Sequence, residues 1–161
     1  MKTKATALLL ATMAIFLCAS AIAWAEEVST EAYVEKVEPI CHKNTTEIEK
    51  DLKPVKTDIR KGKLKTAAIA VAKAARSLQS AYSQLAAVPQ PVASEATLKK
   101  WLGYLKTEVN LTTATSKALK AGKKSLASHD ESQLLHNSNL ANSSIFSFHF
   151  KYCRSELSKF I

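Results

Sequence analysis

The sequence predicts an all-α protein, an up-down-up-down four-helix bundle that follows an N-terminal export signal. Apolar residues recur at steps of three and four through most of residues 34–148, which is the period of an amphipathic helix. The chain has only 3 glycines and 4 prolines, too few for the many turns of a sheet protein. A length of 161 residues with 47% hydrophobic and 23% charged residues favours one globular domain, which we place at 26–161.

The export signal is expected to cover residues 1–25. Two lysines in the MKTK start precede an uncharged stretch, and the AWA that ends at Ala25 matches a small-residue cleavage pattern. We therefore expect a secreted or periplasmic protein. If the segment is not cut, its uncharged part is long enough to anchor the chain in a membrane. Cys18 is not expected to carry a lipid, because a leucine precedes it where a lipobox needs a small residue.

Four helices are expected, at about residues 29–60, 64–88, 94–121 and 129–150. Ser29 or Thr30 can cap the first helix, and a kink or break is expected at Pro39 or Pro54, which lie inside it.

The helix boundaries are marked by single glycines and by one proline-rich segment. Gly62 ends the first helix, VPQPVAS over 88–94 separates the second from the third, and Gly122 ends the third. Ser128 or Asp130 is expected to start the fourth helix, which is the least periodic. The aromatic residues of the last two helices are assigned to the core and to the contacts between helices: Trp101, Tyr104, Phe146, Phe148 and Phe150.

Removal of the export signal leaves two cysteines, Cys41 and Cys153, and an even count in an oxidising compartment indicates a disulfide. A metal or redox pair is the alternative, but the chain has no CxxC and two thiols alone make a poor closed metal site. Short connections make the first and fourth helices antiparallel neighbours, and this topology brings the end of the chain back to its start. The predicted topology and the predicted disulfide therefore agree.

Charge is expected to differ between the two ends of the bundle. Without Lys2 and Lys4 the 23 basic residues fall to 21 against 14 acidic ones, a formal charge of +7. The turn after the first helix and the turn after the third should share one end, which we call the basic end: Arg60, Lys61, Lys63, Lys65, Lys117, Lys120, Lys123 and Lys124. The opposite end is expected to be acidic, with Glu26, Glu27, Glu31, Glu35, Glu38, Glu95 and Glu156.

Two interpretations of the basic end stay open. Cations stabilise helix C-termini and carboxylates stabilise N-termini through the macrodipole, and the lysines could serve only that purpose. Alternatively, the basic end docks on an anionic surface such as lipid headgroups, a cell-wall polyanion or nucleic acid without sequence specificity.

Motifs for familiar chemistry are missing from the sequence. There is no Gly-rich phosphate loop, GxSxG, HExxH or CxxCH, and few carboxylates fall on the predicted apolar faces. His42 and His149 flank the two cysteines and could approach each other in the bundle, but two such ligands are thin support for a metal or haem site. We expect no cofactor, no metal and no enzymatic activity.

Three segments carry a family resemblance: EAYVEKVEPIC at 31–41, VPQPVAS with LKKWLGYL at 88–105, and a closing cysteine. With these segments the chain resembles a group of small exported helical proteins of unknown function, mostly actinobacterial. The resemblance implies a helical fold with a cysteine near each end and brings no catalytic or binding residue. Some members look like lipoproteins, and this chain departs from them by lacking the lipobox.

The expectation for function is a non-enzymatic module of the cell envelope that binds anionic lipid or a polyanion or serves a structural role. A small-ligand- or metal-binding bundle is the second hypothesis, and an enzyme of unrecognised type is the third.

Overall fold

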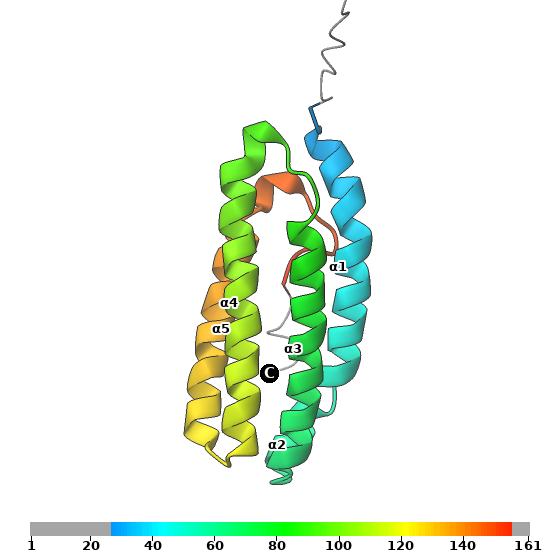
Figure 1. The fold of residues 1–161 in the computed structure, drawn as a ribbon. Coiled ribbons are helices and arrows are strands. Elements are labelled where there is room, and N and C mark those ends of the chain that lie inside the picture. Colours follow the sequence, from blue (N-terminus) through cyan, green and yellow to red (C-terminus); the bar gives the residue numbers. More distant parts are fainter. Residues whose placement is uncertain (1–26, 156–161) are drawn as a thin grey trace, which may run out of the picture.

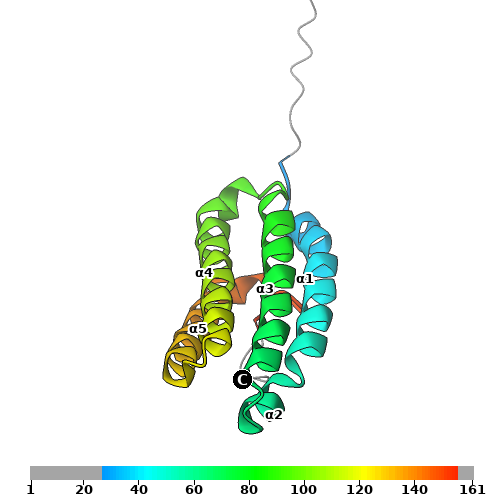
Figure 2. The same cartoon turned by 60° about the horizontal axis from the view of Figure 1, so that its bottom comes forward.

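A computed structural model describes residues 27–155 and confirms an all-α four-helix bundle. The long helices are α1 (Thr30–Leu52), α3 (Leu64–Ala86), α4 (Glu95–Lys120) and α5 (Lys124–Ser144). They run alternately up and down the molecule (Figures 1 and 2). The expected export signal, including Cys18, lies outside the described residues, as do Glu26 and Glu156.

The first predicted helix is interrupted at the second of its two prolines. Ser29 caps α1 by accepting a hydrogen bond from the Ala32 N–H at 3.1 Å, and α1 continues through Pro39. Pro39 is exposed, so water can reach the carbonyl that its missing N–H leaves unpaired. At Pro54 the helix ends and a short helix, α2 (Val55–Arg60), carries the chain to the turn. The expected break is therefore at Pro54.

The fourth helix differs from the prediction at both ends. It begins at Lys124 instead of 129, because the turn at Gly122 takes few residues and the next helix starts at once. It ends at Ser144 instead of 150, and a 3₁₀ turn, η2 (Phe146–Phe148), follows. The backbone of His149 is left-handed, with φ 53°, and turns the chain back toward α1. The second helix ends two residues earlier than expected, and η1 (Val92–Ser94) precedes α4.

The seam between α1 and α5 corrects the expectation that these helices pack directly against each other. The α3–α4, α4–α5 and α1–α3 pairs have close backbone packing, and α1–α5 has none comparable among the described residues. The C-terminal segment 149–155 bridges the seam instead. Backbone N–H groups of Lys151 and Tyr152 donate to the Glu38 carboxylate on α1, and Ser155 exchanges two hydrogen bonds with Asn142 on α5.

The disulfide Cys41–Cys153 fastens this segment to α1, with the two Cα atoms 4.9 Å apart. The pairing expected from the cysteine count is therefore present. The turn of the chain toward α1 explains how it forms even though α1 and α5 do not pack directly.

The core has two parts of different composition. The part near the disulfide is aromatic and contains Tyr33, Trp101, Phe148 and Phe150. Among residues 27–155 the part toward the basic end holds no buried aromatic residue. It is rich in alanine and valine: Val55, Ala67, Ala68, Val71, Ala74, Val109, Ala118 and Ala127. Phe146, expected in the core or between helices, is 75% exposed, because the helix ends before it and the 3₁₀ turn points it outward.

Candidate functional site

The basic end is formed as the topology predicts. The turns at Gly62 and Gly122 lie at the same end of the bundle (Figures 1 and 2). Together they line one shallow depression, to which Lys63, Lys65 and Lys120 contribute. All eight predicted residues are exposed: Arg60, Lys61, Lys63, Lys65, Lys117, Lys120, Lys123 and Lys124.

The two turns have the same backbone construction. Gly62 and Gly122 adopt φ values of 73° and 72°, which side chains other than glycine rarely tolerate. The following N–H groups reach back into the preceding helix, from Lys63 to the Asp58 carbonyl at 2.8 Å and from Lys123 to the Ala118 carbonyl at 2.9 Å. Each helix therefore stops and the next begins within three residues, which concentrates lysines from both helices in a small area.

The helix boundaries place four of these lysines at the start of a helix. Lys124 starts α5, and Lys123 is the N-cap of α5 as well as the residue whose N–H closes the end of α4. Lys63 and Lys65 likewise start α3, and neither helix has an acidic residue in its first turn. A cation at a helix N-terminus is unfavourable, since that end carries a partial positive charge. Helix stabilisation accounts for Arg60, Lys61, Lys117 and Lys120. At Lys63 and Lys123 the ends of two helices act in opposite directions, and for Lys65 and Lys124 it gives no explanation.

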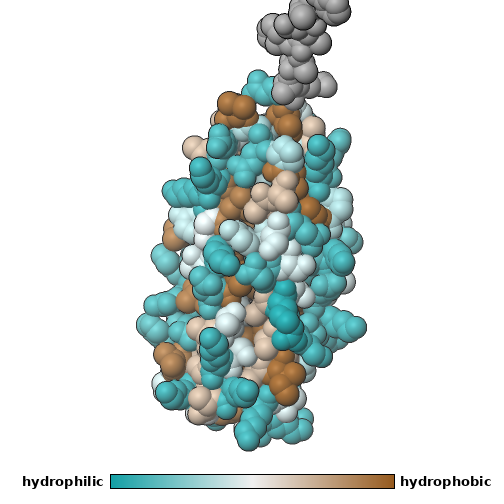
Figure 3. Space-filling model, viewed as in Figure 1, coloured by the Kyte–Doolittle hydropathy of each residue, from teal (hydrophilic) through white to brown (hydrophobic). Residues whose placement is uncertain are grey.

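Positive charge also continues along the face formed by α3 and α4. Helix α3 contains no carboxylate, and Glu95 is the one exposed carboxylate of α4, both helices being described in full. Figure 3 shows this face as mainly hydrophilic, with apolar residues in small separate areas. A shallow groove between the helices is bordered by Lys65, Arg76, Lys117 and Lys120. The floor of the groove is apolar, with Ala68, Ile69, Ala72, Ala75 and Val109, so this surface combines a basic rim with an apolar strip.

The opposite end holds the exposed carboxylates Glu27, Glu31, Glu35 and Glu95. Glu38 serves a structural purpose there, because its carboxylate accepts the two backbone N–H groups of the C-terminal segment. Carboxylates are not confined to that end, since Asp58 and Glu131 lie near the basic end and are half-buried.

The histidines are not gathered around a common point. The ring of His42 lies against Tyr152, with centroids 4.2 Å apart, and His149 is exposed. Both cysteines are joined in the disulfide. Within residues 27–155 there is no group of three or more His, Cys, Asp or Glu side chains arranged to hold a metal ion.

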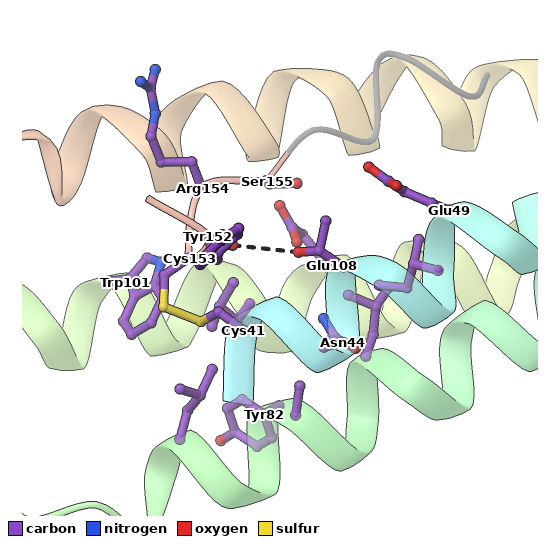
Figure 4. Close-up of a pocket in the computed structure, with 16 residues that line it drawn as sticks. Cys41, Asn44, Glu49, Tyr82, Trp101, Glu108, Tyr152, Cys153, Arg154 and Ser155 are labelled. Carbon is purple, nitrogen blue, oxygen red and sulfur yellow. Dashed lines mark hydrogen bonds between the residues drawn. A yellow bond between two sulfur atoms is a disulfide. The ribbon is translucent and has the colours of Figure 1, made fainter. Parts of the chain in front are cut away.

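A buried carboxylate, Glu108, was missed by the sequence interpretation. It is 1% exposed and lines a cavity of about 60 Å³ beside the disulfide, where Ser155 also lies (Figure 4). Its carboxylate accepts a hydrogen bond from the Ser138 hydroxyl at 2.7 Å, and the Ser155 hydroxyl donates to Ser138 at 3.1 Å. Burial raises the pKa of Glu108 to about 7, against the opposing effect of the Ser138 and Ser155 hydroxyls.

Two further polar atoms of this cavity, Trp101 Nε1 and Asn44 Oδ1, have no hydrogen-bond partner among the described residues. A polar cavity of this size has room for a few water molecules, which would satisfy such groups. The cavity is small, and Glu108, Ser138 and Ser155 are linked by hydrogen bonds, so the arrangement is that of a structural polar cluster.

The sequence did contain a signal for Glu108. Along α4 the spacing of three and four residues connects Trp101, Leu105, Glu108, Thr112 and Thr115, so the glutamate stands on the apolar stripe. A carboxylate in that register predicts either a buried hydrogen-bonded group or a distorted helix.

No helix in the described part of the chain is long and apolar enough to cross a membrane. Comparison with family models, with curated proteins and with solved structures found no match to this chain. The proposals below therefore depend on the geometry of the chain itself.

Proposed function

We propose that this protein is a non-enzymatic binding module of the cell envelope, exported by its first 25 residues, that docks through its basic end on anionic phospholipid. The observation that carries the proposal is the position of Lys63, Lys65, Lys123 and Lys124 at helix N-termini. Their charge is unfavourable to the helices that they begin, so it calls for another role.

The arrangement of the surface supports this proposal. Eight exposed cations lie on or beside the two turns at one end of the bundle, and each lysine near an anionic membrane contributes about 1 kcal/mol before screening. The exposed, mainly polar surface of the two turns, with its one shallow depression, suits contact with headgroups. The attraction acts over roughly one Debye length, about 8 Å at physiological ionic strength, so binding should weaken steeply with salt.

The test is binding of the protein, produced from the full 161-residue chain, to vesicles of phosphatidylglycerol and of phosphatidylcholine across a salt series. We expect binding to the anionic vesicles alone. Replacing Lys63, Lys65, Lys123 and Lys124 by Glu should weaken it by roughly a hundredfold or more. The matched control replaces four exposed lysines away from the basic end by Glu: Lys36, Lys43, Lys73 and Lys99. This control variant should retain most of the vesicle binding.

Stability of the same variant separates docking from helix stabilisation. If the four lysines served the helices, their reversal would lower the free energy of unfolding. We expect a small increase instead, because a carboxylate in a first turn contributes about 0.3–1 kcal/mol. If the control variant loses as much vesicle binding, the loss comes from the lower net charge of the whole protein. That result would contradict the assignment of docking to the basic end. Binding to soluble polyphosphate without binding to vesicles would contradict the choice of lipid.

A further inference from the structure

An apolar cleft lies inside the bundle directly behind the basic end. Its volume is about 220 Å³, and it is lined from α1 and α2 by Leu52, Val55 and Ile59, and from α3, α4 and α5 mainly by Val71, Leu119, Ala127 and Leu134. The described C-terminal segment contacts α1 and α5 nearer the disulfide, through Glu38, Thr45, Ser138 and Asn142, and contributes no residue to the cleft.

The composition of the core explains why the cleft exists. Aromatic rings fill the part near the disulfide, whereas the part near the basic end is packed with alanine and valine. Among the described residues no aromatic side chain lines the cleft, and its aliphatic side chains leave the space open. Protein interiors are normally packed without such voids, so an internal space of this size needs an explanation.

Below its mouth, the cleft is lined mainly by apolar side chains. Thr112 and Thr115 are part of the lining, but their hydroxyls are already bonded within α4. They donate to the carbonyls of Glu108 and Leu111, at 2.7 and 2.9 Å. An apolar cavity of about 150 Å³ in another protein stays dry and takes up benzene, and this cleft is larger. The expected occupant is therefore a hydrocarbon group.

The mouth of the cleft is polar and belongs to the basic end. Lys124, Ser128 and Glu131 line it. Burial raises the pKa of Glu131 and the nearby Lys56 lowers it, so one lysine already faces that carboxylate. Lys124 stands next to Lys123 at the start of α5, where no acidic residue accompanies them in the first turn. Charge at the mouth therefore favours an anionic head on the occupant.

We infer that this cleft binds the hydrocarbon chain of a single-chain anionic amphiphile, with the head held at the mouth by Lys124. The inference deepens the proposed function and rests on it for the source of the ligand, an anionic lipid surface. The binding itself is independent of docking, because a monomeric amphiphile can enter the cleft without a membrane.

The test is calorimetric titration of the protein, produced from the full chain, with decanoate and separately with 1-decanol. We expect both to bind with one site per chain. Ala127→Leu, which fills the cleft, should weaken both by at least about tenfold. Lys124→Glu should weaken decanoate by about tenfold and leave 1-decanol unchanged. Val71→Leu is a second filling variant in case Ala127→Leu does not fold, and Ala86→Leu, on the exposed surface of α3, is the matched control.

The outcomes are distinct from those of the vesicle experiment. Decanoate binding that Ala127→Leu and Val71→Leu leave intact, or the absence of binding by the unmodified chain, overturns the inference even if vesicles bind. Site-specific decanoate binding without vesicle binding overturns the proposed docking and keeps the cleft. Phe160 is an aromatic residue of the C-terminal stretch 156–161, which lies outside the described residues. If the Phe160→Ala variant binds decanoate and the unmodified chain does not, the occupant of the cleft is the chain's own C-terminus and the inference is wrong.

Discussion

Replacing both Cys41 and Cys153 by Ala should lower the free energy of unfolding by about 4–5 kcal/mol. The two cysteines are 112 residues apart, so the disulfide restricts most of the described chain in the unfolded state. By the chain-entropy argument, closing so long a loop stabilises the folded state more than closing a short one. Urea unfolding of the oxidised chain and of the double variant measures the difference.

The double variant also tests what holds the C-terminal segment in place. Apart from the disulfide, the segment is held by hydrogen bonds to Glu38, Thr45, Ser138 and Asn142 and by the buried ring of Phe150. Reducing the unmodified protein should destabilise it as much as the double substitution does, and the reductant should not affect the double variant. A loss below about 1 kcal/mol would mean that these contacts position the segment without the disulfide, and would contradict the prediction.

The periodic, alanine-rich and glycine-bounded elements could be predicted from the sequence. The helix that became α3 and the helix that became α4 were placed to within two residues, because their apolar stripes are long and their ends carry Gly or Pro. The cysteine pairing also followed from the expected removal of Cys18, since the two cysteines that remain allow one pairing only. The start of α5 could not be predicted well, because Lys123 and Lys124 resemble the end of a helix as much as its beginning.

The bridging role of segment 149–155 could not be predicted, because it depends on the space between α1 and α5. That space is set by side chains distant in sequence, and no local pattern in KYCRS encodes it. The apolar cleft is a similar case. Ala127 predicts a good helix wherever it occurs, and only the assembled bundle shows that its small side chain lines an open space.

The unfolding free energy should decrease between pH 4.5 and pH 7 because of Glu108. Its pKa rises from the usual value of 4.5 to about 7 in the folded protein, as burial disfavours the charged form. Over this interval the folded state holds the proton while the unfolded state has lost it, so stability falls by about 1.4 kcal/mol per pH unit. The stabilisation is complete below pH 4.5 and is lost as the pH rises through 7. The total expected change is about 3 kcal/mol.

Glu108→Gln isolates this contribution because it keeps the shape of the side chain and an acceptor for the Ser138 hydroxyl, and it removes the titration. At pH 8 the variant should be more stable than the unmodified protein, and near pH 4.5 the advantage should disappear. Other groups titrate equally in both proteins, so the difference between their pH curves reports Glu108 alone. Parallel curves for Glu108→Gln and the unmodified protein would show that the carboxyl is hydrated and ionised in the folded state. Water in the adjacent cavity would then outweigh the burial.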